Sequence, residues 1–97
     1  MHVKDLQAKV RKDWNENSAL RPTSEQKLLF VIEELGEVAE AIRKKIKSVD
    51  YKVDDGKLGS EFADLVISVV TLANEYDVDL EKEIDGFWEK LAGRRTA

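Results

Sequence analysis

The feature that most constrains this chain is a pair of acidic motifs set in segments that are otherwise apolar. Glu34 and Glu37 are three residues apart, and Glu61 and Asp64 repeat that spacing further along the chain. Residues three apart share one face of a helix, so each motif directs two carboxylates to the same side. The 23 residues between Glu37 and Glu61 suffice to end one helix, turn, and return antiparallel beside it. The sequence therefore predicts four carboxylates that converge between two helices.

Carboxylates that converge in this way need cations to offset their desolvation and their mutual repulsion. The chain contains no cysteine, and its one histidine is His2. Thiolate zinc sites and iron–sulfur sites are therefore excluded, and a metal at this cluster has to be held by oxygen atoms. The sequence predicts a divalent cation with carboxylate ligands.

The overall charge and hydropathy argue against several function classes. The net charge of −4 and the pI near 5.0 disfavour a general nucleic-acid surface, which carries an excess of basic residues. No apolar run reaches the roughly 20 residues that cross a bilayer, and the first residues lack the apolar core of a signal peptide. We therefore expect a cytoplasmic protein without a nucleic-acid or membrane partner. Its 97 residues predict a single helical domain over 1–97.

Apolar residues recur at intervals of three and four in four segments, which predicts an all-α protein. The first helix is expected over 3–16. The second begins where Thr23 and Gln26 fit a capping box, although Ser24 is an equally good cap. These two helices precede the turn that brings the second acidic motif back to the first.

The third and fourth helices have start and stop signals of their own. Ser60 is the expected cap of the third helix, which places Glu61 in its first turn. Asp79 is the expected cap of the fourth helix, which runs over 80–92 and ends at Gly93. The four segments together predict a four-helix bundle.

The third helix is apolar around most of its circumference. Its polar residues fall on one narrow strip, formed by Glu61, Asp64, Ser68, Thr71 and Glu75. A helix of this kind belongs in an interior or an interface, so its polar strip faces either a site or solvent. Because the residues that follow Asp64 are apolar, this acid is expected to be the most enclosed of the four. A chain this short also gains stability from self-association.

The second helix carries local predictions besides its acids. Gly36 marks the close approach of another helix or of a ligand. Glu33 and Glu40 are expected to face solvent, and Glu40 has the favourable order for an ion pair with Lys44. The apolar residues are expected to form one core face: Leu28, Val31, Ile32, Leu35, Val38, Ala39, Ile42 and Ile46.

Two features remain open between a structural and a functional role. Trp14 ends the apolar stripe of the first helix and is either a core side chain or a ring that stacks on a base. The basic segment 43–57 is either a solvated helix end or a rim that collects phosphate. Its turn at 54–56 lacks the ligand spacing of a calcium loop.

The two acidic motifs and their surroundings resemble a known family. The segments Glu34-Leu-Gly-Glu37 and Glu61-Phe-Ala-Asp64 are similar to the ExxE and ExxD pair of the MazG-like, all-α nucleoside triphosphate pyrophosphohydrolases. The resemblance extends to 6–14 and 72–81, and so to nearly the whole chain. It implies a Mg²⁺-dependent hydrolase, with Mn²⁺ as a substitute, that converts a (deoxy)nucleoside triphosphate to the monophosphate and pyrophosphate. Such activity serves nucleotide-pool house-cleaning.

The resemblance also implies roles for individual acids. Glu34, Glu37, Glu61 and Asp64 match the family's metal ligands, and as ligands they take part in catalysis. Glu33 is a candidate general base, although the helical wheel directs it away from the four ligands.

Substrate binding and assembly are implied in less detail. Trp14 is the first candidate for stacking on the base and Trp88 the second. Lys90 and Arg94 are candidates for holding the phosphates, because family members use basic residues near this position, although the helix dipole alone also accounts for cations there. Members of the family assemble as homodimers or homotetramers.

Two other function classes are weighed against this one. A non-enzymatic helical bundle that self-associates, or that binds a partner through its second or third helix, would tolerate replacement of its acids by amides. A di-iron carboxylate oxidase needs Glu-x-x-His pairs on its helices, and the chain has no histidine beyond His2.

Overall fold

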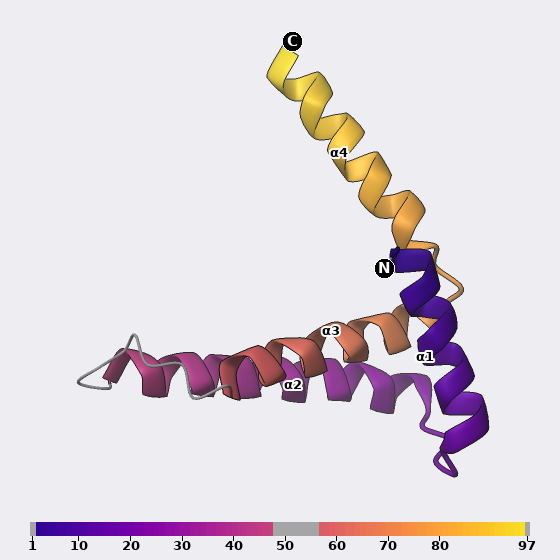
Figure 1. Cartoon of the computed structure of the whole chain (residues 1–97), viewed down its shortest axis with the longest axis vertical. Coiled ribbons are helices and arrows are strands. Elements are labelled where there is room, and N and C mark those ends of the chain that lie inside the picture. The colour runs from indigo at the N-terminus through magenta and orange to yellow at the C-terminus, as the bar shows by residue number, and fades with distance from the viewer. Residues whose placement is uncertain (1, 48–56, 97) are drawn as a thin grey trace.

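The computed structural model describes residues 2–47 and 57–96, and every regular element in these ranges is a helix. The helices are α1 (Val3–Asn17), α2 (Ser24–Lys47), α3 (Lys57–Glu75) and α4 (Leu80–Thr96), as Figure 1 shows. The prediction of an all-α protein with four helices is confirmed. No helix within the described ranges has the length and apolar character needed to cross a membrane.

The helices α2 and α3 form an antiparallel pair that carries both acidic motifs (Figure 1). α1 packs across the end of this pair where α3 finishes, and α4 starts beside the first turns of α1. From there α4 runs away from α2 and α3 as a separate arm. The antiparallel pair positions the candidate site, and α1 joins that pair to the arm.

The start of α2 confirms the predicted capping box. The Thr23 backbone N–H donates to Gln26 Oε1 at 2.8 Å, and the Gln26 backbone N–H donates to Thr23 Oγ1 at 3.2 Å. Thr23 is therefore the cap, because its side chain and that of Gln26 satisfy donors that the first turn of a helix leaves unpaired. Ser24 has another role, since its hydroxyl donates to Glu75 Oε1 on α3 at 2.6 Å.

Two predicted helix ends are wrong. α3 begins at Lys57, so Ser60 lies inside the helix and Glu61 is beyond the first turn. α4 continues through Gly93 to Thr96. Both signals are weak, because serine is tolerated near a helix start and glycine ends a helix only when it takes a left-handed conformation, which Gly93 does not. An internal glycine costs about 1 kcal/mol, and the following arginines favour the helix end electrostatically.

The side chain of Gln7 on α1 fastens the connection between α3 and α4. Its Nε2 donates to Asn74 Oδ1 at 3.0 Å and to the Val78 carbonyl at 2.8 Å. Its Oε1 accepts from the Leu80 backbone N–H at 3.0 Å. Asn74 Nδ2 returns a hydrogen bond to the Gln7 carbonyl at 3.0 Å. One side chain therefore fixes the end of α3, the connection and the first residue of α4.

The connection itself contains two aspartates with different roles. Asp79 Oδ1 accepts from the Lys82 backbone N–H at 3.1 Å, which confirms the predicted cap of α4. Asp77 has a φ of 53°, a left-handed conformation that aspartate tolerates better than most residues. The chain reverses at this point and directs α4 away from the helix pair.

Few apolar side chains are buried within one chain. Among the described residues, Val10, Val38 and Val70 are the buried apolar ones. The core face predicted for α2 is wrong for most of its members, since Ile32 and Leu35 are each 56% exposed. α3 covers the side of α2 that carries Val38 and Glu34 and leaves most of the predicted core face open. The chain therefore exposes more apolar surface than a stable monomer usually does.

Two further predictions on α2 are not met by contacts within the described chain. No other described part of the chain approaches Gly36, where an added Cβ would meet no atom within 4 Å. Glu40 pairs with Arg43 rather than Lys44, and Arg43 Nε donates to Glu40 Oε2 at 2.9 Å. That hydrogen bond is the main reason why the pKa of Glu40 lies below its usual value, and Lys44 contributes at longer range. The predicted turn at 54–56 and Lys52 lie outside the described residues.

We expect Gln7→Ala to lower the free energy of unfolding by about 1–3 kcal/mol, because partly buried donors and acceptors lose their partners. Urea denaturation at a fixed protein concentration measures this change. Lys12→Ala is the matched control, since Lys12 is exposed on the same helix. Equal stability of the two variants would show that Gln7 does not hold the connection.

Candidate metal centre

The antiparallel pairing of α2 and α3 brings three carboxylates together. Glu34 on α2 and Glu61 and Asp64 on α3 each offer an oxygen atom, and the three atoms lie within 4.8 Å of one another. Glu61 and Asp64 meet Glu34 because residues three apart on α3 share the face that packs on α2. Three of the four predicted ligands therefore converge as the sequence suggested.

Glu37 and Glu33 lie beside this cluster without belonging to it. Both side chains are exposed, and neither is among the acids whose oxygen atoms converge. Their charges still act on Glu34. Glu37 lies one turn from Glu34 on α2, and its role as a ligand stays a prediction.

The expectation that Asp64 is the most enclosed acid is wrong. Asp64 is exposed, whereas Glu34 and Glu61 are half-buried. Residues adjacent in sequence point to different sides of a helix, so the apolar residues that follow Asp64 do not enclose it. The cluster is thus open on the Asp64 side, where a ligand and water can enter.

The electrostatics of the cluster favour a bound cation. Desolvation raises the pKa of Glu34 above its usual value of 4.5, and the charges of Asp64 and Glu61 raise it further. Both effects disfavour the ionised carboxylate. A bound cation would favour the ionised form and so oppose both of them.

The donor set fits a hard divalent cation. Carboxylate oxygens without thiolate or imidazole are the ligands that Mg²⁺, Mn²⁺ and Ca²⁺ prefer. Two oxygens on one octahedral Mg²⁺ are about 3.0 Å apart in neighbouring positions and about 4.2 Å apart in opposite ones. The cluster, at up to 4.8 Å, is close to that span, so small side-chain rotations would complete a site.

The polar strip of α3 continues from the cluster to Trp14. Thr71 is buried, donates to the Ile67 carbonyl at 2.8 Å and accepts from Trp14 Nε1 at 3.2 Å. Thr71 lies seven residues beyond Asp64, which corresponds to about 10 Å along a helix. At Thr71 the strip thus faces the inside of the protein rather than solvent. The alternative that the strip is the solvated side of α3 is wrong at this position.

Trp14 combines features of the two roles that its sequence position left open. Its side chain is half-buried, and its indole nitrogen is anchored on Thr71. It also lines a cavity of about 230 Å³ together with polar and charged residues: Arg11, Asn15, Lys27, Thr71, Asn74 and Glu75. The ring is therefore held in place, and part of it stays accessible.

Lys27 is a site residue that the sequence interpretation missed. Its Nζ forms an ion pair with Glu75 Oε2 at 2.6 Å, and both side chains are largely shielded from solvent. Hydrogen bonds from Lys27 and Ser24 lower the pKa of Glu75. A signal was present, because a lysine in the first turn of a helix opposes the helix dipole and indicates an acidic partner.

The basic residues of α4 are not brought to the acidic cluster by this chain. Lys90 and Arg94 are exposed and lie toward the far end of α4, which points away from α2 and α3 (Figure 1). Trp88, the second candidate for base stacking, lies on the same arm and is 58% exposed. Their predicted contacts with substrate would have to come from another subunit.

Comparison with known protein families supports this arrangement. The model of the MazG nucleotide pyrophosphohydrolase domain matches residues 22–97, which include both acidic motifs and the helices α2 to α4. The chain belongs to the MazG family. Comparison with curated proteins and with solved structures gave no match. MazG members generally use divalent metals, which agrees with the carboxylate cluster.

In chelator, we expect Asp64→Asn to melt at a temperature equal to or higher than the unmodified protein, because one of three like charges is removed. The unmodified protein should gain stability from millimolar Mg²⁺, and the variant should gain less. Glu89→Gln on α4, which removes an exposed acid remote from the cluster, is the matched control and should behave like the unmodified protein.

The same measurement has a pH dependence of known sign. Because folding raises the pKa of Glu34, the folded protein binds its proton more tightly, and stability falls as pH rises from 4.5 through the raised pKa. Glu34→Gln removes this titration and should flatten the curve in chelator. A lower melting temperature of Asp64→Asn in chelator, or an unchanged pH curve of Glu34→Gln, would contradict a repulsive cluster.

Proposed function

We propose that this protein is a Mg²⁺-dependent nucleoside triphosphate pyrophosphohydrolase that acts in nucleotide-pool house-cleaning. It would convert a (deoxy)nucleoside triphosphate to the monophosphate and pyrophosphate, with Mn²⁺ able to replace Mg²⁺. The observation that carries the proposal is the meeting of Glu34, Glu61 and Asp64 within the segment matched to the MazG family. MazG membership supports hydrolysis of a nucleotide, and the carboxylate cluster supports the choice of cation.

In this proposal the acids hold the cation, and the cation in turn binds the phosphates of the substrate. Glu34, Glu61 and Asp64 are the primary ligands, and Glu37 completes the set after a change of rotamer. A divalent cation bound there would offset the charge of the triphosphate and make an attacking water more acidic. The open side at Asp64 admits the phosphate chain.

The reaction is an in-line attack of water on the α-phosphorus. A bond forms between the water oxygen and the α-phosphorus, and the bond from that phosphorus to the bridging oxygen breaks. Pyrophosphate leaves with the electron pair, and a carboxylate accepts the proton. Glu33 is the proposed acceptor, because it is an exposed acid beside the cluster that need not hold metal.

Trp14 is the proposed contact for the base. The strip of α3 spans about 10 Å from Asp64 to Thr71, which suits the distance between the phosphates and the base of an extended nucleotide. The half-buried ring anchored on Thr71 offers a rigid stacking surface. Lys90 and Arg94 would contact the phosphates from another subunit.

We further propose that the 97-residue chain is a single domain that works as a homodimer or homotetramer. Apolar side chains such as Leu29 on α2 and Phe62 on α3 are 53% and 46% exposed, which is costly in a monomer. The same exposed surface is what a non-enzymatic interaction module would use. Metal dependence and sensitivity of the acids to amide substitution separate the two functions.

With Mg²⁺ present, we expect pyrophosphate and a monophosphate as products across a panel of nucleoside triphosphates. Asp64→Asn should reduce turnover by on the order of 100-fold or more, because a metal ligand and its charge are lost. Anion-exchange chromatography of the products tests both points, with Glu89→Gln as a control that should stay active. Primary release of inorganic phosphate and a nucleoside diphosphate, or a fully active Asp64→Asn variant, would refute the proposed reaction.

Light scattering at micromolar concentration should give a mass at least twice the 11.1 kDa of one chain. The expectation rests on the exposed apolar surface and on the small core. A folded monomer under these conditions would refute the proposed assembly without bearing on the metal cluster.

A further inference from the structure

The helix α4 presents an apolar stripe that its own chain leaves uncovered. Ile84, Phe87 and Trp88 are 42%, 57% and 58% exposed. The Phe87 and Trp88 rings pack edge to face with their centroids 5.1 Å apart, so they form one rigid apolar surface. Glu83 and Asp85 border the stripe on its two sides at helical spacing, and neither forms an ion pair within the described part of the chain.

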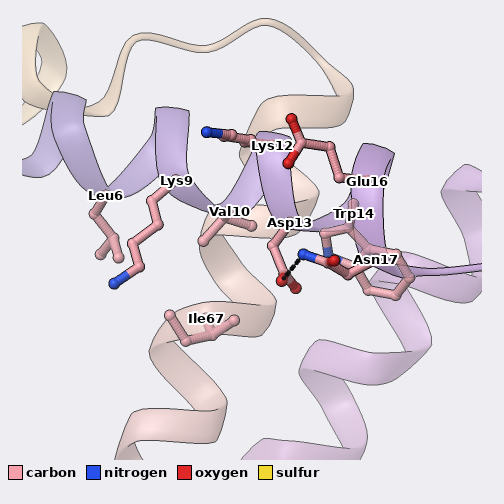
Figure 2. A pocket seen from close by; sticks show the side chains of 9 residues that line it. All are labelled: Leu6, Lys9, Val10, Lys12, Asp13, Trp14, Glu16, Asn17 and Ile67. Carbon is pink, nitrogen blue, oxygen red and sulfur yellow. Dashed lines mark hydrogen bonds between the residues drawn. The ribbon is translucent and has the colours of Figure 1, made fainter.

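A groove between α1 and α3 has the matching chemistry. Its volume is about 520 Å³, and its apolar walls are Leu6, Val10, Trp14 and Ile67 (Figure 2). Lys9 extends beside Leu6 on the side of α1 that faces Ile67, and the groove is also lined by Lys12, Asp13, Glu16 and Asn17. Among the described residues none forms an ion pair with Lys9.

We propose that the groove of one subunit receives the apolar stripe of α4 from a second copy of this chain, and that the exchange is reciprocal. Charge complementarity supports this occupant. Residues 81–89 of α4 carry four acids and one lysine, whereas α1 as a whole carries four cations and three acids. Lys9 at the groove therefore meets Glu83 or Asp85 at the border of the stripe.

The arm cannot fill the groove of its own chain. Gln7 holds the Leu80 backbone against the first half of α1, and the Lys4 backbone N–H contacts Glu81. From this point α1 and α4 run in diverging directions (Figure 1). The occupant of the groove has to come from another molecule, and a second copy supplies a stripe of the right kind.

The open apolar face of α2 is a less suitable partner for the stripe. Leu29 and Ile32 on that face have acidic neighbours, Glu25 and Glu33, which would repel Glu83 and Asp85. The groove is lined by as many lysines as acids, and neither Lys9 nor Lys12 forms an ion pair within the described part of the chain. A reciprocal contact also closes on itself under two-fold symmetry and uses each stripe and each groove once. Aromatic side chains that insert into a pocket typically dominate such interfaces.

The contact can be tested directly because the chain contains no cysteine. A chain with Lys9→Cys is co-expressed with a chain of different size that carries Asp85→Cys, and a short thiol crosslinker is added. We expect the crosslinked heterodimer as the main product. Arg11→Cys with Asp85→Cys is the matched control, since Arg11 is exposed on the same helix and does not line the groove, and it should give roughly a fifth of the product or less. Equal yields, or preferential crosslinking of Asp85→Cys to Leu29→Cys on α2, overturn the proposal.

A substitution in the stripe gives a second measurement. Phe87→Asp should raise the dissociation constant of the dimer by on the order of 100-fold, because a buried aromatic anchor is replaced by a charge. Lys82→Asp, on the opposite side of α4, is the control and should leave association unchanged. Unchanged association of Phe87→Asp overturns the proposal, and the crosslinking decides if this variant does not fold. Neither measurement needs substrate or metal, so an inactive protein that still crosslinks would refute the proposed function alone.

Discussion

The inward orientation of the polar strip on α3 is the constraint on which the rest of this structure depends. Thr71 is buried and bonded to Trp14, Glu75 is paired with Lys27, and Glu61 and Asp64 meet Glu34. The strip takes the place that an apolar seam would occupy in an ordinary helix pair. The apolar sides of α3 are displaced outward in consequence, and Phe62 and Val66 are 46% and 50% exposed. A site built between two helices thus creates the need for a partner surface outside them.

The two ends of this polar seam have opposite electrostatic character. At the end near α1, Lys27 and Ser24 bind Glu75 and lower its pKa, so that contact contributes stability above pH 4.5 that is lost as pH falls through the lowered pKa. At the other end, desolvation and the neighbouring like charges raise the pKa of Glu34, and the ionised cluster opposes folding. The attractive end offsets the repulsive one and keeps α2 and α3 paired. A cation at the cluster would turn both ends into attractive contacts.

Local signals predicted much of this structure, because they depend on neighbours along one helix. The capping box at Thr23, the cap at Asp79 and the meeting of Glu34 with the second acid pair follow from residue types and their spacing. Predictions that depend on what lies across from a residue were less successful. Asp64 is exposed although apolar residues follow it, and none of the described helices approaches Gly36. The sequence of one chain does not show which face another element covers, and here several faces are open.

The helix α1 joins the pair of α2 and α3, which carries the carboxylate cluster, to the start of α4. It precedes the segment matched to the MazG family, yet it supplies Gln7, which fixes the start of α4, and Trp14, which binds the strip of α3. The acids themselves need only α2 and α3 to meet. A change in α1 therefore leaves the carboxylates in place and alters the direction of the arm or the surface beside Thr71. The contacts of α1 and the carboxylate cluster can therefore be disturbed independently, since different residues carry them.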